Sequence, residues 1–366
     1  MSRLADPLHT YSKNSAIVIE RIRHLPIGGR MKDIPRHLWH DSYVRTGAKK
    51  TGGPNLRLLR LDPTKPSNTV TAYIFNKFAH PTEDRYITPR EAARLQQFPD
   101  THIFAGPITS IQLQIGNAVP VGLAQAVAKH VYSNLETRNR KEKPKAISLF
   151  AGAGGMDLGF GKFFDIISTN ELVPYFAQTL RNNFPDTTVI EGDISGFTGR
   201  DFNEQGTQVD LVFGGPPCQP FSSAGKHRGV NDPRGAMVSE FLRIVDEVRP
   251  RFFVMENVPG LVSNAKGGAL RFIQEETRSL GYGFEFYILN ATEYGVPQAR
   301  RRLFIFGRRD LDSPELGAPA PTHSVDGHQF DLLLEPCSTV ADAFRGLGPA
   351  MPRDYASSRA LHLSKF

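Results

Sequence analysis

Three short segments carry side chains that could perform covalent chemistry together. Cys218 lies in GGPPCQPFSSAG, a segment that follows a very apolar run and whose prolines exclude a regular helix. Glu256 closes another apolar run, in MENVPG, and three arginines at 300–302 lead into a third, LFIFG. A thiolate can add to a carbon centre, a carboxyl can carry a proton and a guanidinium can hold an oxygen. Most free cysteines are buried and inert, but these neighbours favour a reactive thiol at Cys218.

The elements that must position these groups have the pattern of an α/β domain. From about residue 146, β-rich runs alternate with amphipathic stretches, which is typical of βαβ units on a mostly parallel, doubly wound sheet. We expect strands at 146–150, 166–170, 209–214, 251–256 and 302–307, and helices at 173–184 and 235–248. Ligands of such sheets bind beyond the carboxyl ends of the strands, where Cys218 and Glu256 fall.

The N-terminal part of the chain predicts a smaller lobe. Residues 25–70 are rich in Gly, Pro, Arg and Lys with little periodicity, which suits loops. Helices are expected at 88–98, where a Thr cap precedes Pro, and at 121–135, before a charged tether at 136–145. We therefore divide the chain into a small lobe, a large domain and a segment that returns to the small lobe: 1–112, 113–314 and 315–366.

Charge and cysteine content narrow the class of protein. The net charge is +7, and residues 1–65 hold thirteen Lys/Arg against five Asp/Glu while the remainder is balanced, 31 against 32. This basic excess suits either a solvated basic surface or a polyanionic partner such as nucleic acid. The two cysteines form no CxxC pair or metal-ligand cluster, so neither a disulfide framework nor a metal site is predicted. No apolar run is long enough for a membrane span and no secretory signal is evident, so a cytoplasmic location is expected.

A glycine-rich turn and two acids favour a nucleoside pocket at the same sheet edge. FAGAGGMDLG directly follows the first expected strand, and its glycines allow a tight turn close to a ligand. Asp157 stands where a dinucleotide-binding turn needs a small residue, which disfavours a nicotinamide-dependent oxidoreductase. Glu171 ends the second strand, where an acid commonly accepts hydrogen bonds from ribose, and Asp193 follows a third strand and could bind an adenine amino group.

Taken together, these segments resemble the C5 family of DNA cytosine methyltransferases. FAGAGG, NE, GDI, GPPCQPFS, ENV and QARRR occur in that family's order. TPREAARLQQFPD (88–100) and QIGNAVP (114–120) resemble the family's last two blocks, yet here they precede the first. The sequence is therefore similar to a circularly permuted member. In such a member Phe366 and Met1 lie near each other on the small lobe.

The resemblance implies a Rossmann-like methyltransferase sheet, a smaller target-recognition lobe and S-adenosyl-L-methionine as cofactor. Cys218 would be the nucleophile that adds to C6 of cytosine, Glu256 would engage N3, Arg302 would hold O2, and Arg300 would support the loop or contact DNA. The cofactor would be held by Phe150, Gly152, Gly154, Glu171, Asp193 and Asn117. One departure is Ser148, where many members carry an acid.

The resemblance also implies double-stranded DNA as the substrate of a restriction–modification enzyme. The target base would be flipped into the pocket, and residues 1–65 would hold phosphates and read base edges. The expected DNA-contacting residues are Gln219, Ser222, Thr69, Arg57 and Arg60. A cognate restriction endonuclease would act separately, and the methyltransferase is expected to be a monomer.

Two other functions are compatible with the same fold. A tRNA cytosine-5 methyltransferase would use the same nucleophile, although the Arg/Lys-rich segment favours DNA. A non-catalytic homologue would only bind nucleic acid, and the presence of Cys218, Glu256 and Arg302 disfavours it.

Overall fold

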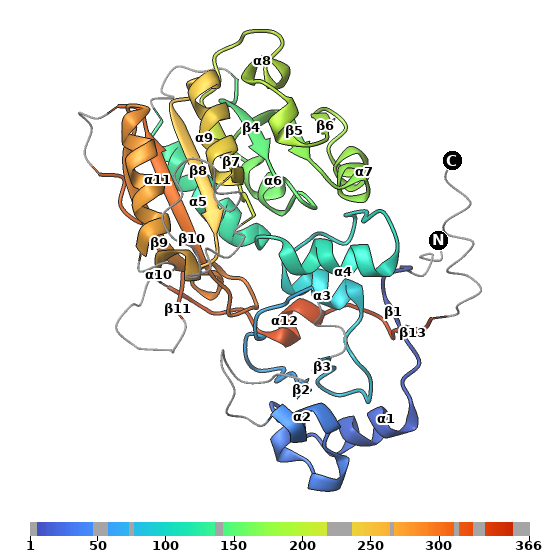
Figure 1. Ribbon diagram of the computed structural model, residues 1–366. Coiled ribbons are helices and arrows are strands. Elements are labelled where there is room, and N and C mark those ends of the chain that lie inside the picture. Colours follow the sequence, from blue (N-terminus) through green and yellow to red (C-terminus); the bar gives the residue numbers. More distant parts are fainter. Residues whose placement is uncertain are drawn as a thin grey trace.

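The computed structural model describes residues 6–46, 58–72, 77–135, 142–217, 236–263, 267–310, 315–324 and 334–353. Within these ranges no helix is long and apolar enough to cross a membrane. The molecule has a large sheet domain above a smaller helical lobe in the view of Figure 1.

A seven-stranded sheet forms the large domain, with the strand order β6-β5-β4-β7-β8-β10-β9. The first five strands in this order run parallel, and β10 is antiparallel to both of its neighbours. This arrangement confirms the doubly wound, mostly parallel sheet. The strands are β4 (Lys145–Leu149), β5 (Asp165–Glu171), β6 (Thr188–Glu191), β7 (Leu211–Gly214), β8 (Phe252–Asn257), β9 (Gly283–Asn290) and β10 (Arg301–Arg308).

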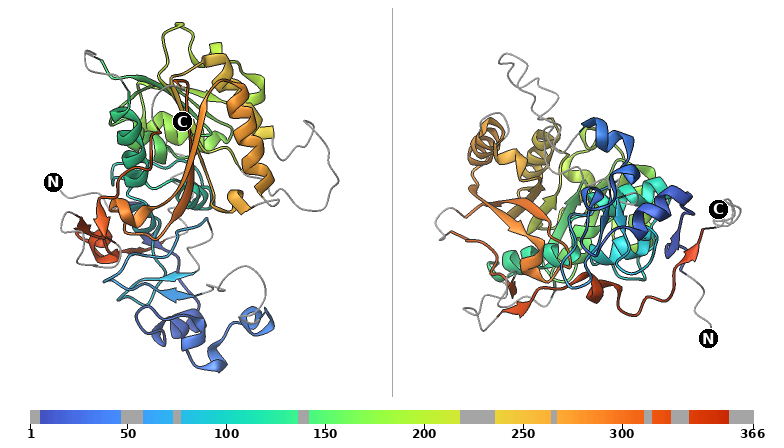
Figure 2. Two further views of the ribbon diagram at one scale, coloured as in Figure 1. Left: turned by 90° about the vertical axis from the view of Figure 1, so that its left-hand side faces the viewer. Right: turned by 90° about the horizontal axis from the view of Figure 1, so that it is seen from below.

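Helices cover both faces of this sheet because its strands are apolar on both sides. Phe213 and Val254 pack with α5 (Val121–Ser133) and α6 (Gly155–Phe160) on one face. Val212 and Phe253 pack with α8 (Gly199–Phe202), α9 (Ala236–Val248) and α11 (Gly268–Ser279) on the other. The left view of Figure 2 shows teal α5 and orange α11 on opposite sides of the sheet.

Most of the expected elements are confirmed, with boundaries shifted by a few residues, but β9 was missed. β9 is an edge strand with exposed Phe286 and Ile288, so it lacks the clear apolar-in, polar-out alternation of a half-buried strand. The expected helices correspond to α7 (Pro174–Asn183), α9, α5 and α3 (Pro89–Leu95). Thr88 caps α3 as expected, because its Oγ1 accepts from Glu91 N at 3.2 Å.

The smaller lobe is built from short elements around a core that includes Ile22, Met31 and Leu38. Its helices α3 and α4 (Ile108–Asn117), together with α12 (Val340–Phe344), lie between this core and the sheet (Figure 1). Besides β1 and β13, which are given below, the other elements in the described ranges are α1 (Ala16–Arg23), η1 (Met31–Asp33), η2 (Arg36–Leu38), α2 (Asp41–Thr46), β2 (Leu59–Arg60), β3 (Phe78–Ala79), η4 (Ile194–Gly196), α10 (Gly260–Ser263), η6 (Ala291–Tyr294), β11 (His323–Ser324) and β12 (Glu335–Pro336).

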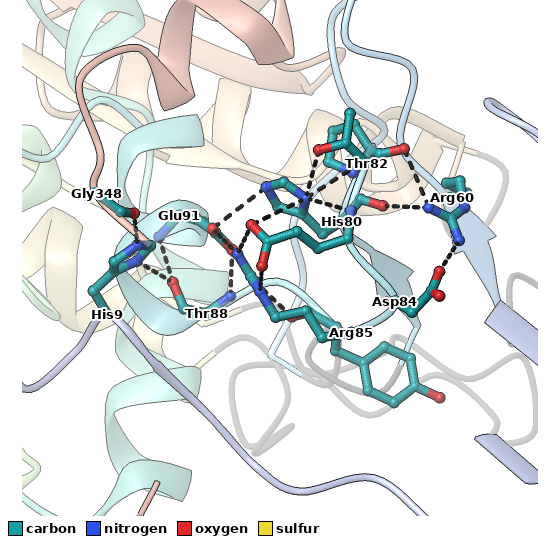
Figure 3. A network of polar contacts seen from close by, with 12 residues as sticks. His9, Arg60, His80, Thr82, Asp84, Arg85, Thr88, Glu91 and Gly348 are labelled. Carbon is teal, nitrogen blue, oxygen red and sulfur yellow. Dashed lines mark hydrogen bonds and ion pairs between the residues drawn. The ribbon is translucent and has the colours of Figure 1, made fainter. Parts of the chain in front are cut away.

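The two ends of the described chain lie side by side. β1 (Thr10–Tyr11) pairs in parallel with β13 (Met351–Pro352). The ring of His9 contacts Gly348 O at 2.8 Å and Thr88 Oγ1 at 3.1 Å, which fixes both ends to the start of α3 (Figure 3). Met1 and Phe366 themselves lie outside the described residues.

Candidate active site

A cavity of about 310 Å³ opens at the carboxyl ends of β4, β5 and β7. The chain turns from β4 to β5 on one side and returns to β7 on the other, so the cavity occupies the topological switch point where such sheets bind ligands. Its wall combines segments far apart in the sequence and includes Gln114, Asn117, Phe150, Gly152, Glu171, Asp193, Pro217 and Glu256.

The glycine-rich turn after β4 forms one side of this cavity. Phe150, Gly152 and Gly154 have φ values of 54°, 60° and 78°, and Gly154 is the N-cap of α6. A Cβ on Gly154 would stand 2.5 Å from the Phe184 ring, whereas one on Gly152 would meet open space. The turn therefore requires glycine for its backbone shape and leaves room for a ligand at Gly152.

Glu171 holds the turn and also faces the cavity. Its Oε2 accepts from Gly152 N at 2.7 Å, and its Oε1 accepts from Val173 N at 2.9 Å. Burial raises the pKa of Glu171, while these backbone hydrogen bonds lower it. Asp193 is exposed at the start of η4, where hydrogen bonds from the backbone and hydroxyl of Ser195 lower its pKa.

Asp157 is a fully buried acid behind the turn. Burial raises its pKa to about 7, and the hydroxyls of Ser148 and Thr169 partly oppose this shift. These hydroxyls are near the carboxyl but outside hydrogen-bonding geometry: among the described residues, Asp157 Oδ2, Ser148 Oγ and Thr169 Oγ1 are buried without a hydrogen-bond partner. Ser148, near the end of β4, thus lies close to a buried acid on α6.

Glu256 and Arg302 meet at the opposite side of the cavity. Arg302 Nε lies 2.9 Å from Glu256 Oε1, and the side chains are 15% and 13% exposed. Burial raises the pKa of Glu256, and the two guanidinium groups of Arg302 and Arg300 lower it. The net shift is upward, so this carboxyl retains a proton to a higher pH than a free glutamate.

Cys218, Gln219, Ser222 and Arg57 lie outside the described residues. Gly215 and Pro217, which follow β7 and precede Cys218 in the sequence, line the cavity. Asn257 Nδ2 donates to Pro216 O at 3.1 Å, which joins the start of this loop to the strand that carries Glu256.

Arg300 lies inside the protein and does not line the cavity. It is 1% exposed and donates to the carbonyls of Val70 at 2.6 Å, Gly116 at 3.0 Å and Asn117 at 3.4 Å. Burial lowers its pKa to about 9. Arg300 was expected either to support the loop or to contact DNA. Its buried position suits the first role.

A buried amide network beside Arg300 was not expected from the sequence. Gln298 Oε1 accepts from Val70 N at 2.7 Å, and its Nε2 donates to Gln96 Oε1 at 2.9 Å. Thr69 Oγ1 donates to Ala299 O at 2.7 Å. The QARRR motif offered a signal for this network: its four polar side chains cannot all face a substrate at once, so some of them must be buried in the protein.

The expected contact between Arg60 and DNA does not suit its position. Arg60 is 6% exposed, donates to Ile22 O at 2.6 Å and pairs with Asp84 at 2.9 Å (Figure 3). It also donates to the carbonyls of His80 and Pro81. Arg60 therefore joins the loop after β3 to the core of the small lobe.

Comparison with known proteins places these observations in one family. The family model described as C-5 cytosine-specific DNA methylase matches residues 16–133 and 144–336. The chain is 45% identical over 239 residues to the Type II methyltransferase M.AquIA of Picosynechococcus sp., covering 60% of this chain and 94% of that protein. It is 42% identical over 170 residues to the Type II methyltransferase M.NgoPII of Neisseria gonorrhoeae, covering 46% and 49%.

Among solved structures, the chain is similar to a putative DNA modification methyltransferase encoded within a prophage of E. coli. The sequence identity is 28%, the match covers 56% of each chain and the TM-score is 0.47. The chain thus spans nearly all of M.AquIA, but only about half the length of M.NgoPII and of the prophage protein.

Replacement of Asp157 by Asn should remove a pH dependence of stability. The folded protein raises the pKa of Asp157 from 3.8 to about 7. The contribution of its protonated carboxyl to the free energy of unfolding is therefore fully present below about pH 4 and is lost as the pH rises to about 7. The melting temperature of Asp157→Asn relative to the parent should therefore rise between pH 5 and 7.5. Asp165→Asn, at an exposed position, is the control, and curves parallel to the parent for Asp157→Asn would refute this assignment.

Glu171→Ala should weaken binding of S-adenosylmethionine by about 1–3 kcal/mol, the scale for loss of a hydrogen bond to a charged group. Calorimetric titration measures the affinity. Glu191 is the matched control, since it lies opposite Glu171 on β6 but pairs with Arg181 at 2.8 Å and does not line the cavity. If Glu171→Ala and Glu191→Ala bind S-adenosylmethionine with equal affinity, Glu171 has no role in cofactor binding.

Proposed function

The chain belongs to the C-5 cytosine-specific DNA methylase family, and we propose that it transfers a methyl group to C5 of cytosine in duplex DNA. The modification role in a restriction–modification system follows from its Type II relatives. One observation carries the proposal: Glu256, which pairs with Arg302, and Pro217, which precedes Cys218 in the sequence, line the same cavity as the glycine-rich turn.

The cavity suits S-adenosylmethionine, the methyl donor of this family. Its wall has open space at Gly152, an acid at Glu171 and a second, exposed acid at Asp193, which together fit a nucleoside with hydroxyl and amino donors. Phe150, Gly154 and Asn117 complete the proposed contacts. When bound, this cofactor supplies an electrophilic methyl group.

The opposite wall suits a cytosine ring. We assign Cys218 as the nucleophile whose thiolate forms a bond to C6, which gives C5 the enamine character it needs to attack a methyl group. Glu256, with its raised pKa, gives N3 the proton that balances the added electron pair, and Arg302 holds O2. Once C5 carries the methyl group, a base removes the C5 proton, N3 returns its proton to Glu256, and the C6–S bond breaks to restore the aromatic ring and the thiolate.

The DNA is expected to bind between the sheet and the small lobe. Lys32 and Arg36 are exposed on that lobe, within the basic N-terminal segment, and can contact phosphates. Thr69 is held beside Arg300, at the level of the catalytic wall, which supports its proposed approach to the target nucleotide. Gln219, Ser222 and Arg57 remain proposed contacts.

Circular permutation of the family blocks belongs to the same proposal. It is supported by α5, which precedes β4 in the chain yet packs on the sheet, and by the pairing of β1 with β13. The proposed domain limits of 1–112, 113–314 and 315–366 follow, with the first and last segments forming one lobe.

Incubation of a mixed-sequence plasmid with enzyme and S-adenosylmethionine, followed by bisulfite sequencing, should show cytosine methylation at one fixed motif. Cys218→Ser should abolish the methylation while leaving folding and DNA binding intact, because a loop thiol contributes little to the core. Methylation of tRNA but not of the plasmid, or near-normal turnover by Cys218→Ser, would contradict the proposal.

Relocation of the chain ends should preserve the enzyme. A short flexible linker from Phe366 to Met1, combined with a new opening within 136–145, should give a soluble enzyme of unchanged sequence specificity, because closure of a short loop costs little entropy. Gel filtration and bisulfite sequencing provide the readouts. Insoluble protein with several linker lengths would speak against the rotated order.

A further inference from the structure

A buried histidine from the N-terminal half of the chain supports the glycine-rich turn from behind. His102 lies between α3 and α4 and is 2% exposed. Its Nε2 is 3.1 Å from Ala153 O. A carbonyl oxygen can only accept, so the proton of the neutral ring is on Nε2 and His102 is the donor.

The surroundings keep His102 neutral and fix its ring. The rings of Phe98, Phe104 and Phe184 lie 4.8, 4.7 and 6.4 Å from it, between centroids. Burial lowers the pKa of His102 to about 4, with a smaller contribution from the nearby positive charge of Arg90. The Nε2–H donor is therefore present throughout the neutral range.

The segment around His102 is itself fastened to a rigid frame. Ile103 N donates to Asn183 Oδ1 at 2.9 Å, and Asn183 Nδ2 donates to Ile103 O at 2.8 Å. Ala105 N donates to Thr179 Oγ1 at 2.9 Å, and Thr179 Oγ1 donates to Gln114 Oε1 at 2.6 Å. The histidine is thus anchored to α7 and to α4, and both helices contribute residues to the cavity wall.

The turn needs support of this kind because its backbone is strained. It contains three residues with positive φ, one of which, Phe150, is not glycine. Glu171 fixes the N–H of Gly152, and His102 fixes the carbonyl of Ala153, so the turn is held from both sides. Without His102 this carbonyl would be a buried acceptor without its donor.

We propose that His102 is a positioning residue for the methyl-donor site: its hydrogen bond to Ala153 holds the turn in the shape that presents Phe150 and Gly152 to the cofactor. This inference rests on the proposed function of the cavity. It also gives the N-terminal block an indirect part in cofactor binding, through the turn, in addition to the residues of that block that line the wall.

Two substitutions separate the hydrogen bond from the ring. His102→Phe keeps an aromatic ring but removes the donor, and should weaken S-adenosylmethionine binding about tenfold, the scale of one lost hydrogen bond to a buried acceptor. His102→Gln keeps an N–H donor and should recover part of that affinity. The turnover rate at saturating cofactor should change little, so KM for the cofactor should rise while kcat is retained.

His130 offers a matched control. Its Nε2 contacts Gly317 O at 3.0 Å, also across a large sequence separation, but on α5 away from the cavity. His130→Phe should therefore lower the melting temperature without change in cofactor affinity. Calorimetric titration of each variant with S-adenosylmethionine alone gives the comparison.

The outcomes distinguish this inference from the proposed function. A parent protein that does not bind S-adenosylmethionine would overturn the function, whereas a parent that binds and a folded His102→Phe of equal affinity would overturn the role of His102. If His102→Phe does not fold, ¹⁵N-histidine spectra of the parent serve instead. The Nε2–H signal of His102 is the parent signal that is absent from the spectrum of His102→Gln. It should shift when S-adenosylmethionine is added to the parent, and an unchanged signal would refute the role of His102.

Discussion

The site depends on the hydrogen bonds that the buried guanidinium of Arg300 donates to backbone carbonyls. The guanidinium donates to carbonyls of two segments, 70 and 116–117, that are far from it in the sequence. No acid pairs with it among the described residues, so charge-assisted hydrogen bonds to carbonyls must offset the cost of burying a cation. Gly116 permits this convergence, because a Cβ there would stand 2.2 Å from Ala72 N.

The same anchor sets the catalytic wall. Arg300 directly precedes β10, in which Arg301 is exposed and Arg302 is half-buried. Two residues beyond the buried Arg300, Arg302 lies against Glu256, across the pairing of β10 with β8. Thr69, bonded to Ala299, is brought to the same level from the small lobe. The Arg300 anchor thus aligns segments from both lobes on one side of the cavity.

Residues at the ends of core strands could be predicted from the sequence. Glu256 and Arg302 were expected at one edge of the sheet and are in contact there, because apolar strand patterns are strong in the parallel core. Burial of single polar residues could not be predicted. Arg60 lies in the basic N-terminal segment and Arg300 lies in the QARRR motif, so both were expected to be able to contact DNA. Both instead donate to backbone carbonyls inside the protein. His102 was equally hidden, since its partner Ala153 is 51 residues away and offers only a backbone oxygen.

The covalent role of Cys218 is the central chemical claim, and a trapped adduct tests it most directly. Duplex DNA with 5-fluorocytosine at the mapped target should, with S-adenosylmethionine present, remain covalently attached to the enzyme, because fluorine at C5 cannot leave as a proton. Mass spectrometry of the digested complex should place the modified base on the peptide that contains Cys218. A preparation that methylates ordinary DNA but forms no adduct, or forms it on another residue, would contradict the account.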